Sequence, residues 1–285
     1  MIRLKKIVLS LFLILFTIEL GLLAFGTYKY IKTRSQFDGF LQMLQLQFKE
    51  YGSIDLPDTN LDTIGNPQGV SFDGTYLYVS YRRHLYKILL TTGSIVSEID
   101  TTTMGTFGDG NGDLQYYNGF LYVCNSNFRT GGIDGKVSKY NADGLSFVQE
   151  YSLPVKNVPS TITQKDGYFW VIRYTSPTTL QKYSLDFTQL LDEYTLGNNA
   201  GDGVTWIGNY LLINQHEVSD GNIKWGNAYL YYFRDNSFKL VNTIQKHDLW
   251  GQGIHFDQAS NTLFIVKRGY TKSKNKIIFS NITFK

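Results

Sequence analysis

Five related segments recur along this chain, and their repetition constrains the possible fold more than any other feature. Each consists of a short apolar strand, a tight turn and an aromatic strand. The segments are PQGVSFDGTYLYVS (67–80), NGDLQYYNGFLYVC (111–124), PSTITQKDGYFWVI (159–172), GDGVTWIGNYLLIN (201–214) and GQGIHFDQASNTLFIV (251–266). A repeat period of roughly 40–50 residues built from strand–turn–strand units is typical of a β-propeller.

The turns and flanking strands fit this interpretation. Asp73-Gly74, Asn118-Gly119 and Asp166-Gly167 tolerate the positive φ angles that tight hairpins require. A third strand follows each pair, and a fourth follows in the first four units. The last unit lacks a fourth strand because the chain stops at Lys285, and YGSIDLP (51–57) can supply it by pairing with 276–284. We therefore expect an all-β, five-bladed propeller over residues 51–285.

Composition supports this fold and narrows the choice of partners. Aromatic residues make up 15% of the chain, and 27 glycines accompany only 5 prolines, which suits strands joined by turns. The first 34 residues hold six basic residues and one acid, which leaves 21 basic and 23 acidic residues in the remainder. The expected propeller is thus near neutral, and no block of like charge favours nucleic acid binding. The single cysteine, Cys124, lies in an apolar run and is expected to be buried.

The N-terminal residues predict a membrane anchor. A basic start precedes about nineteen mostly apolar residues, 7–25, near the length needed to cross a bilayer. A signal peptide cleaved near Ala24-Phe25-Gly26 is the alternative, but its apolar region is usually shorter. We expect residues 1–34 to form an uncleaved, single-pass signal-anchor with the propeller on the extracytoplasmic side. Glu19 lies within the apolar run and is either tolerated there or faces a partner helix.

Residues 35–50 connect the expected anchor to the propeller. Phe37, Phe40, Leu41, Leu44 and Phe48 fall at helical spacing, with glutamines between them. This spacing predicts an amphipathic linker helix, which could pair with a second chain or pack against its own domain.

A calcium-loop motif overlaps the second repeat. Asp109-Gly-Asn111-Gly-Asp113 resembles the start of such a loop. Leu114 stands where the loop needs glycine, however, and Phe120 stands at the twelfth position in place of glutamate. We therefore interpret this stretch mainly as one copy of the repeated blade unit. A Ca²⁺ ion bound by Asp109 and Asp113 is the less favoured alternative. No cofactor and no other metal site is expected.

The starts of the inner strands and the loops after the second strands should meet at one mouth of the central channel. Opposed charges at this mouth suit a small zwitterionic or carboxylate-bearing ligand. A self-satisfied network of Asp–Arg bridges that only braces the blades is the competing explanation. The expected site comprises Gln68, Asp113, Arg173, Asp202, Trp206, His216, Gln252 and Lys267.

The five repeats resemble the five-bladed glutaminyl cyclotransferases of plant and bacterial type, and more loosely the NHL and lactonase-like propellers. In the cyclotransferases a Gln-Gly-Leu motif opens the first blade, and Gln68-Gly69-Val70 matches it. The resemblance implies a catalytic acid in the second blade, where Asp113 stands in place of the family's glutamate. Trp206 corresponds to one channel tryptophan, whereas Ser160-Thr161 replaces another.

Three hypotheses about function follow. The first is a membrane-anchored propeller that binds a small polar ligand or a protein partner through its channel face. The second is a cyclotransferase-like or other propeller enzyme, in which Asp113 and Asp202 are the catalytic candidates, Arg173 or Lys267 holds a carboxylate, and Trp206 packs the substrate. The third is a spacer or assembly subunit that uses the outer faces of the blades or the 35–50 helix. Fold alone cannot decide among them.

Overall fold

The computed structural model describes residues 45–57, 64–104, 110–126, 135–154, 158–173, 177–197, 201–219, 222–245, 251–268 and 275–284. In these ranges the regular structure is β-strand, apart from one 3₁₀ turn, Thr101–Met104 (η1). The expected all-β class is therefore confirmed.

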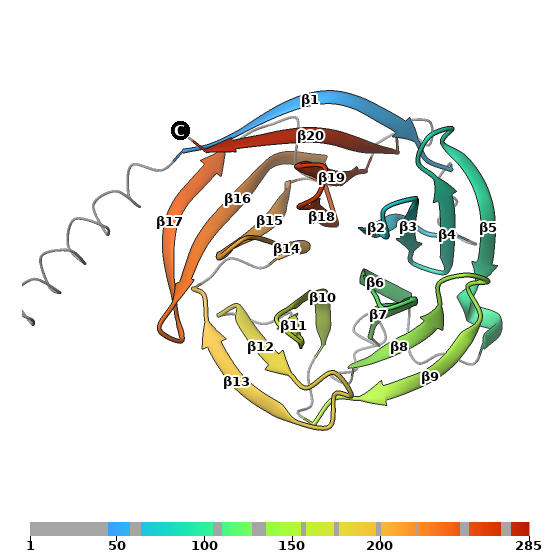
Figure 1. Ribbon diagram of the computed structural model, residues 1–285, viewed down its shortest axis with the longest axis horizontal. Coiled ribbons are helices and arrows are strands. Elements are labelled where there is room, and N and C mark those ends of the chain that lie inside the picture. Colours follow the sequence, from blue (N-terminus) through green and yellow to red (C-terminus); the bar gives the residue numbers. More distant parts are fainter. Residues whose placement is uncertain are drawn as a thin grey trace, which may run out of the picture. The chain divides into compact units, whose positions relative to one another are not determined.

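The strands form five four-stranded antiparallel sheets arranged as blades around a ring (Figure 1). Inner strands lie nearest the centre in Figure 1, and outer strands form the circumference. Blade 1 comprises β2 (Pro67–Phe72), β3 (Tyr76–Tyr81), β4 (His84–Leu89) and β5 (Ser94–Asp100); blade 2 comprises β6 (Gly110–Tyr117), β7 (Phe120–Ser126), β8 (Gly135–Asn141) and β9 (Phe147–Ser152). Blade 3 comprises β10 (Pro159–Lys165), β11 (Tyr168–Arg173), β12 (Thr179–Tyr183) and β13 (Leu190–Thr195); blade 4 comprises β14 (Gly203–Ile207), β15 (Tyr210–Ser219), β16 (Asn222–Arg234) and β17 (Ser237–Gln245).

Blade 5 closes the ring with strands from both ends of the described chain. β18 (Ile254–Asp257), β19 (Thr262–Lys267) and β20 (Lys276–Phe284) are joined by β1 (Leu46–Asp55), which lies along β20 (Figure 1). The register runs from Leu46 opposite Phe284 to Asp55 opposite Lys276. This pairing confirms the predicted closure of the ring by an N-terminal strand. The strand covers an edge of β20 that would otherwise be exposed.

The closing strand corrects one boundary. Residues 46–50 belong to β1, whereas the helical spacing over 35–50 predicted a helix there. The physical reason is that Leu46 and Phe48 also alternate with polar residues at period two, and pairing with β20 decides between the two patterns. Residues 35–44 lie outside the described ranges, as does the expected anchor at 7–26. Within the described part of the chain, no helix is long and apolar enough to span a bilayer.

The hydrophobic core lies between neighbouring blades. One cluster joins blades 5 and 1 and includes Leu56, Val70, Tyr81 and Val266, and three similar clusters join blades 1 to 2, 2 to 3 and 3 to 4. Burial of these apolar surfaces is the main force that holds the ring together.

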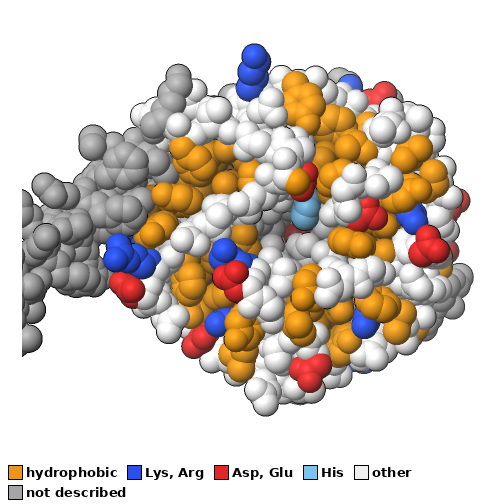
Figure 2. Space-filling model, in the orientation of Figure 1, with side chains coloured by type: hydrophobic (Ala, Val, Ile, Leu, Met, Phe, Trp, Pro, Cys, Tyr) orange, Lys and Arg blue, Asp and Glu red, His pale blue; other side chains and the backbone are white. Residues whose placement is uncertain are grey.

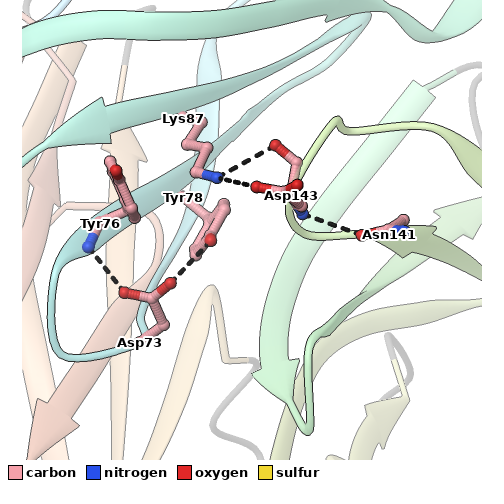
Figure 3. A network of polar contacts seen from close by, with 6 residues as sticks. All are labelled: Asp73, Tyr76, Tyr78, Lys87, Asn141 and Asp143. Carbon is pink, nitrogen blue, oxygen red and sulfur yellow. Dashed lines mark hydrogen bonds and ion pairs between the residues drawn. The ribbon is translucent and has the colours of Figure 1, made fainter.

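Polar contacts also join the blades, as Figure 3 shows for blades 1 and 2. Lys87 Nζ donates to the Asp143 carbonyl oxygen at 3.0 Å and lies 3.3 Å from Asp143 Oδ1. In the adjacent hairpin, Tyr78 Oη donates to Asp73 Oδ2 at 2.8 Å. Burial and this carboxylate raise the pKa of Tyr78, so its hydroxyl stays protonated. The network fixes two hairpin ends relative to each other.

Candidate functional site

The inner strands start at one end of the ring, which we call the start face. It is defined by Gln68, Gly112-Asp113, Ser160, Asp202 and Gln252. The second strand of each blade ends there, because antiparallel pairing sets Pro67 opposite Tyr81 and Pro159 opposite Arg173. Register shifts occur at Pro67/Gly69, Asn111/Leu114 and Pro159/Thr161. Such bulges re-aim side chains and are common beside functional sites.

Glycines allow neighbouring inner strands to approach closely immediately beneath this face. A methyl carbon added to Gly203 would lie 2.6 Å from the Ile254 amide nitrogen and 2.7 Å from the Gln252 carbonyl oxygen. One added to Gly112 would lie 2.8 Å from the Ser160 carbonyl oxygen, and one added to Gly253 would lie 2.8 Å from the Gln68 carbonyl oxygen. The inner strands therefore approach each other backbone to backbone, and we call this level the floor.

Asp113 is part of the floor. Its side chain is only 2% exposed, and its Oδ1 accepts the Leu114 N–H at 2.9 Å. Burial raises the pKa of the carboxyl well above its usual value, and hydrogen bonds from backbone amides of Leu114, Ile162, Val204 and Val70 oppose that shift. Asp113 Oδ2 has no hydrogen-bond partner of ordinary geometry among the described residues.

Cationic side chains from three blades surround the floor on the start face. Each of them is half-buried, and together with His84 they define what we call the basic rim. Arg268 lies with its guanidinium nitrogens 2.8 and 3.3 Å from the Asn66 side-chain oxygen, in the amide orientation that satisfies both groups. The half-buried acid on this face is Asp202. The rim comprises Arg82, Arg83, His84, Arg173, Lys267 and Arg268.

Arg173 differs from the other rim cations in its contacts. It ends β11 and is half-buried, and its Nε is enclosed with no hydrogen-bond partner among the described residues. A buried donor of a charged group without a partner is costly, since it loses water without gaining an acceptor. A ligand oxygen would offset this cost.

Most of the other predicted site residues share the start face with Arg173. Gln68 is half-buried and its Nε2 donates to the Asn66 carbonyl oxygen at 3.3 Å. Gln252 is 6% exposed, and Asn214 Nδ2 donates to its carbonyl oxygen at 3.0 Å. Lys267 ends β19, opposite Lys276 of β20. His216 pairs with Gly226 through its backbone, and its side chain lies outside the described part.

Trp206 is not brought together with this group. It packs against Trp170 at 5.3 Å and Phe238 at 5.9 Å between ring centroids, inside the core shared by blades 3 and 4. Lys165 Nζ lies 5.3 Å from the centre of its ring. The channel role that the family resemblance implied for Trp206 thus has no supporting contact, because the strand carries this side chain toward the neighbouring blade.

The possible calcium site is only partly described, since Asp109 lies outside the described ranges. Among the described residues, no three His, Cys, Asp or Glu side chains gather closely enough to hold a metal.

A second set of inner-strand residues escaped the sequence reasoning. Two positions beyond the floor, every inner strand carries a polar residue: Ser71, Gln115, Thr163, Thr205 and His255. Ser71 Oγ accepts the Tyr116 N–H at 2.9 Å, and Thr205 Oγ1 accepts the Phe256 N–H at 2.9 Å. Aligning the five repeats column by column would have revealed this polar position.

His255 is half-buried among these residues. Its Nδ1 lies 3.4 Å from Ser71 Oγ, and burial lowers its pKa to about 4. Figure 2 shows the ring hollowed near its centre, with charged groups scattered over the blades.

Comparison with known proteins adds a likeness of fold. No family model matches the chain, and no curated protein matches it. Among solved structures, the glutaminyl cyclase of Myxococcus xanthus is similar, with a TM-score of 0.60 over 84% of this chain and 97% of that one, at 10% identity. The Pan2 WD40 domain of Neurospora crassa gives a TM-score of 0.45 over 70% of this chain and 58% of that one, at 9% identity. The predicted five-bladed propeller, similar in architecture to a glutaminyl cyclase, is confirmed at the level of fold.

Proposed function

We propose that this chain is a membrane-anchored propeller that binds a small carboxylate-bearing ligand on its start face. The observation that carries the proposal is Arg173, whose enclosed Nε lacks a partner within a rim of cationic side chains. Arginine suits carboxylates because its planar fork can make two parallel charge-assisted hydrogen bonds.

The floor would form the base of the ligand site. At Gly112, Gly203 and Gly253 neighbouring inner strands approach backbone to backbone, so a ligand on the start face would lie above this level and above Asp113. Asp202 and the side-chain amide of Gln68 can accept or donate hydrogen bonds to an ammonium or hydroxyl group of the same ligand. A small zwitterion therefore fits the arrangement of charges better than an apolar molecule.

Thermal-shift measurements on the full chain in detergent micelles test the proposal. A panel of dicarboxylates, amino acids and dipeptides should contain compounds that raise the melting temperature by mass action. Arg173→Gln should weaken binding of the best compound about tenfold or more, the loss expected for hydrogen bonds to a charged group. Arg234→Gln is the matched control, because Arg234 lies at an exposed hairpin beside Asp235. Equal binding by both variants would remove Arg173 from the account.

A second candidate function is cyclisation of N-terminal glutaminyl residues, favoured by the fold likeness to a glutaminyl cyclase and by the buried carboxyl of Asp113. In that reaction the α-amino nitrogen attacks the side-chain amide carbon, and ammonia leaves after a proton transfer that Asp113 would mediate. Mass spectrometry of a peptide with N-terminal glutamine, incubated with wild type and with Asp113→Asn, tests it. No loss of ammonia above the uncatalysed rate eliminates this candidate.

The anchor is tested separately by topology. Protease added to intact cells should remove the propeller while the membranes retain an uncut N-terminus. A soluble form beginning near Thr27 would instead identify a cleaved signal peptide.

A further inference from the structure

The end of the ring opposite the start face carries the hairpins that join first and second strands, and we call it the turn face. Exposed large hydrophobic side chains gather around its circumference. Among the described residues, all of them except Tyr51 lie in the turn-face half of a strand or in a loop at this end. Every blade contributes, and we call this set the apolar collar. The collar comprises Ile95, Val96, Val148, Leu185, Leu191, Leu240 and Phe284.

The start-face ends of the outer strands are polar. The difference is not required for folding, because the outer strands form the circumference of the ring along their whole length (Figure 1). Hydrophobic residues exposed singly need no explanation, but their restriction to one rim in all five blades indicates a surface that contacts something apolar. The polar residues that end β1, β5, β9, β13 and β17 at the start face are Asp55, Asp100, Ser152, Thr195 and Gln245.

Lysines and aromatic rings lie beside the collar. At the turn face, the second strands of blades 1, 2 and 3 begin with half-buried aromatic residues, and a lysine of the third strand lies over each ring. The lysine nitrogens lie 4.3 Å from the ring centre of Tyr76, 3.8 Å from that of Phe120 and 4.0 Å from that of Tyr168. Tyrosine rings and lysine stems suit the boundary between lipid and water, because each has an apolar body and a polar tip.

The chain also enters the ring at the turn face. β1 begins there, where Leu46 lies opposite Phe284 of the collar. Residues 1–44 precede this point and include the apolar run over 7–25 that is expected to anchor the chain. We propose that the turn face rests on a phospholipid bilayer, with the collar inserted among the headgroups. This inference rests on the membrane anchor of the proposed function, and it leaves the start face directed toward solution, where a soluble ligand can reach it.

The charges on the turn face favour zwitterionic lipids. Asp73, Asp186 and Asp257 accept hydrogen bonds within their own turns. Recognition of anionic lipids uses clusters of lysine and arginine, whereas here acids lie beside the basic groups. A phosphatidylcholine headgroup therefore fits this face better than an acidic one. The ion pairs at this end are Lys87–Asp143, Lys165–Asp166 and Arg234–Asp235, at 3.3, 3.6 and 3.6 Å.

Fluorescence quenching by spin-labelled lipids tests the inference on the full chain in phosphatidylcholine liposomes. Single cysteines that carry a fluorophore replace Val148 or Leu191 of the collar. Ser152 and Thr195 are the matched controls, because they lie at the start-face ends of the same two strands, β9 and β13. All four positions are exposed, so the substitutions should change stability little. Cys124 is fully buried and should not be labelled.

Lipids with a nitroxide near the headgroup should lower the emission at positions 148 and 191 by about half or more, and they should leave positions 152 and 195, up to about 13 Å farther from the bilayer, nearly unchanged. Equal quenching within each pair would overturn the inference, since a collar that binds a protein or stays in water brings neither position close to lipid. Replacing phosphatidylcholine by phosphatidylglycerol should not increase the quenching, and an increase would contradict the choice of zwitterionic lipid.

Flotation of the liposomes on a density gradient separates this inference from the proposed function. A chain that does not float with the liposomes lacks the anchor, and the inference fails with it. A chain that floats without selective quenching keeps the anchor and refutes only the contact of the turn face with lipid. Ligand binding at the start face is measured independently of both results.

Discussion

Gly203→Ala probes the closed floor directly. The added methyl carbon would lie 2.6 Å from the Ile254 amide nitrogen and from Asn214 Oδ1, and 2.7 Å from the Gln252 carbonyl oxygen. Favourable contacts between heavy atoms lie near 3.5–4.0 Å, so β14 and β18 must separate by about 1 Å. Overpacking typically costs about 1–3 kcal/mol. Two of the three groups met are backbone and cannot rotate away, so we expect the upper end, about 3 kcal/mol.

The control for this variant is Gly144→Ala. A methyl carbon there meets no atom within 4 Å, and the backbone of this exposed turn does not need a positive φ. Both substitutions reduce the entropy of the unfolded chain similarly, so their difference isolates the clash. Differential scanning calorimetry should place Gly203→Ala about 6–12 °C below Gly144→Ala, at about 2–4 °C per kcal/mol for a chain of this size. Melting temperatures within about 1 °C of each other, well under the shift from 1 kcal/mol, would refute the close approach of β14 and β18.

Three further predictions concern stability. Leu56 is 7% exposed in the core between blades 5 and 1, and Leu56→Ala should lower the unfolding free energy by about 2–5 kcal/mol. Val96 is 49% exposed, and the control Val96→Ala should change the unfolding free energy by about 0.5 kcal/mol or less. Because the pKa of the Asp113 carboxyl is raised in the folded state, this carboxyl contributes most to stability below its pKa in the unfolded chain, about 4. The unfolding free energy of wild type relative to Asp113→Asn should therefore fall as pH rises above about 4. Denaturant titrations in which this difference does not change with pH would contradict the prediction. The pKa of His255 is lowered to about 4, so its effect on stability changes with pH in the opposite direction. Wild type should lose stability relative to His255→Gln as pH falls from about 6.5 to 4. Parallel pH profiles of the two proteins would contradict this prediction.

Much of the fold could be predicted from local chemistry. Asn118-Gly119 and Asp166-Gly167 adopt positive φ angles of 49° and 82°, and of 52° and 80°, as expected for tight hairpins. The incomplete fifth unit predicted closure by an N-terminal strand, because an unpaired edge is unfavourable. The start of that strand could not be predicted, since Phe48 fits both the helical spacing of residues 35–50 and an alternating pattern with Leu46.

The candidate site was harder to predict, because strand order does not reveal where a side chain points. Asp113 was expected at an open mouth, but close approach of glycine backbones encloses it. Trp206 was expected to pack a substrate in the channel, whereas the structure places its ring in the core between blades 3 and 4. Arg173 was among the expected residues, yet its enclosed and unpartnered Nε emerges only from three-dimensional packing.

The most direct test of the account is a crystal structure of the protein with the carboxylate that stabilises it most. The account predicts ligand density on the start face, with a carboxylate group against the Arg173 guanidinium and the floor at Asp113 closed beneath it. Density for the ligand beside His255 instead, or a continuous open channel through the level of Gly69 and Gly203, would contradict it.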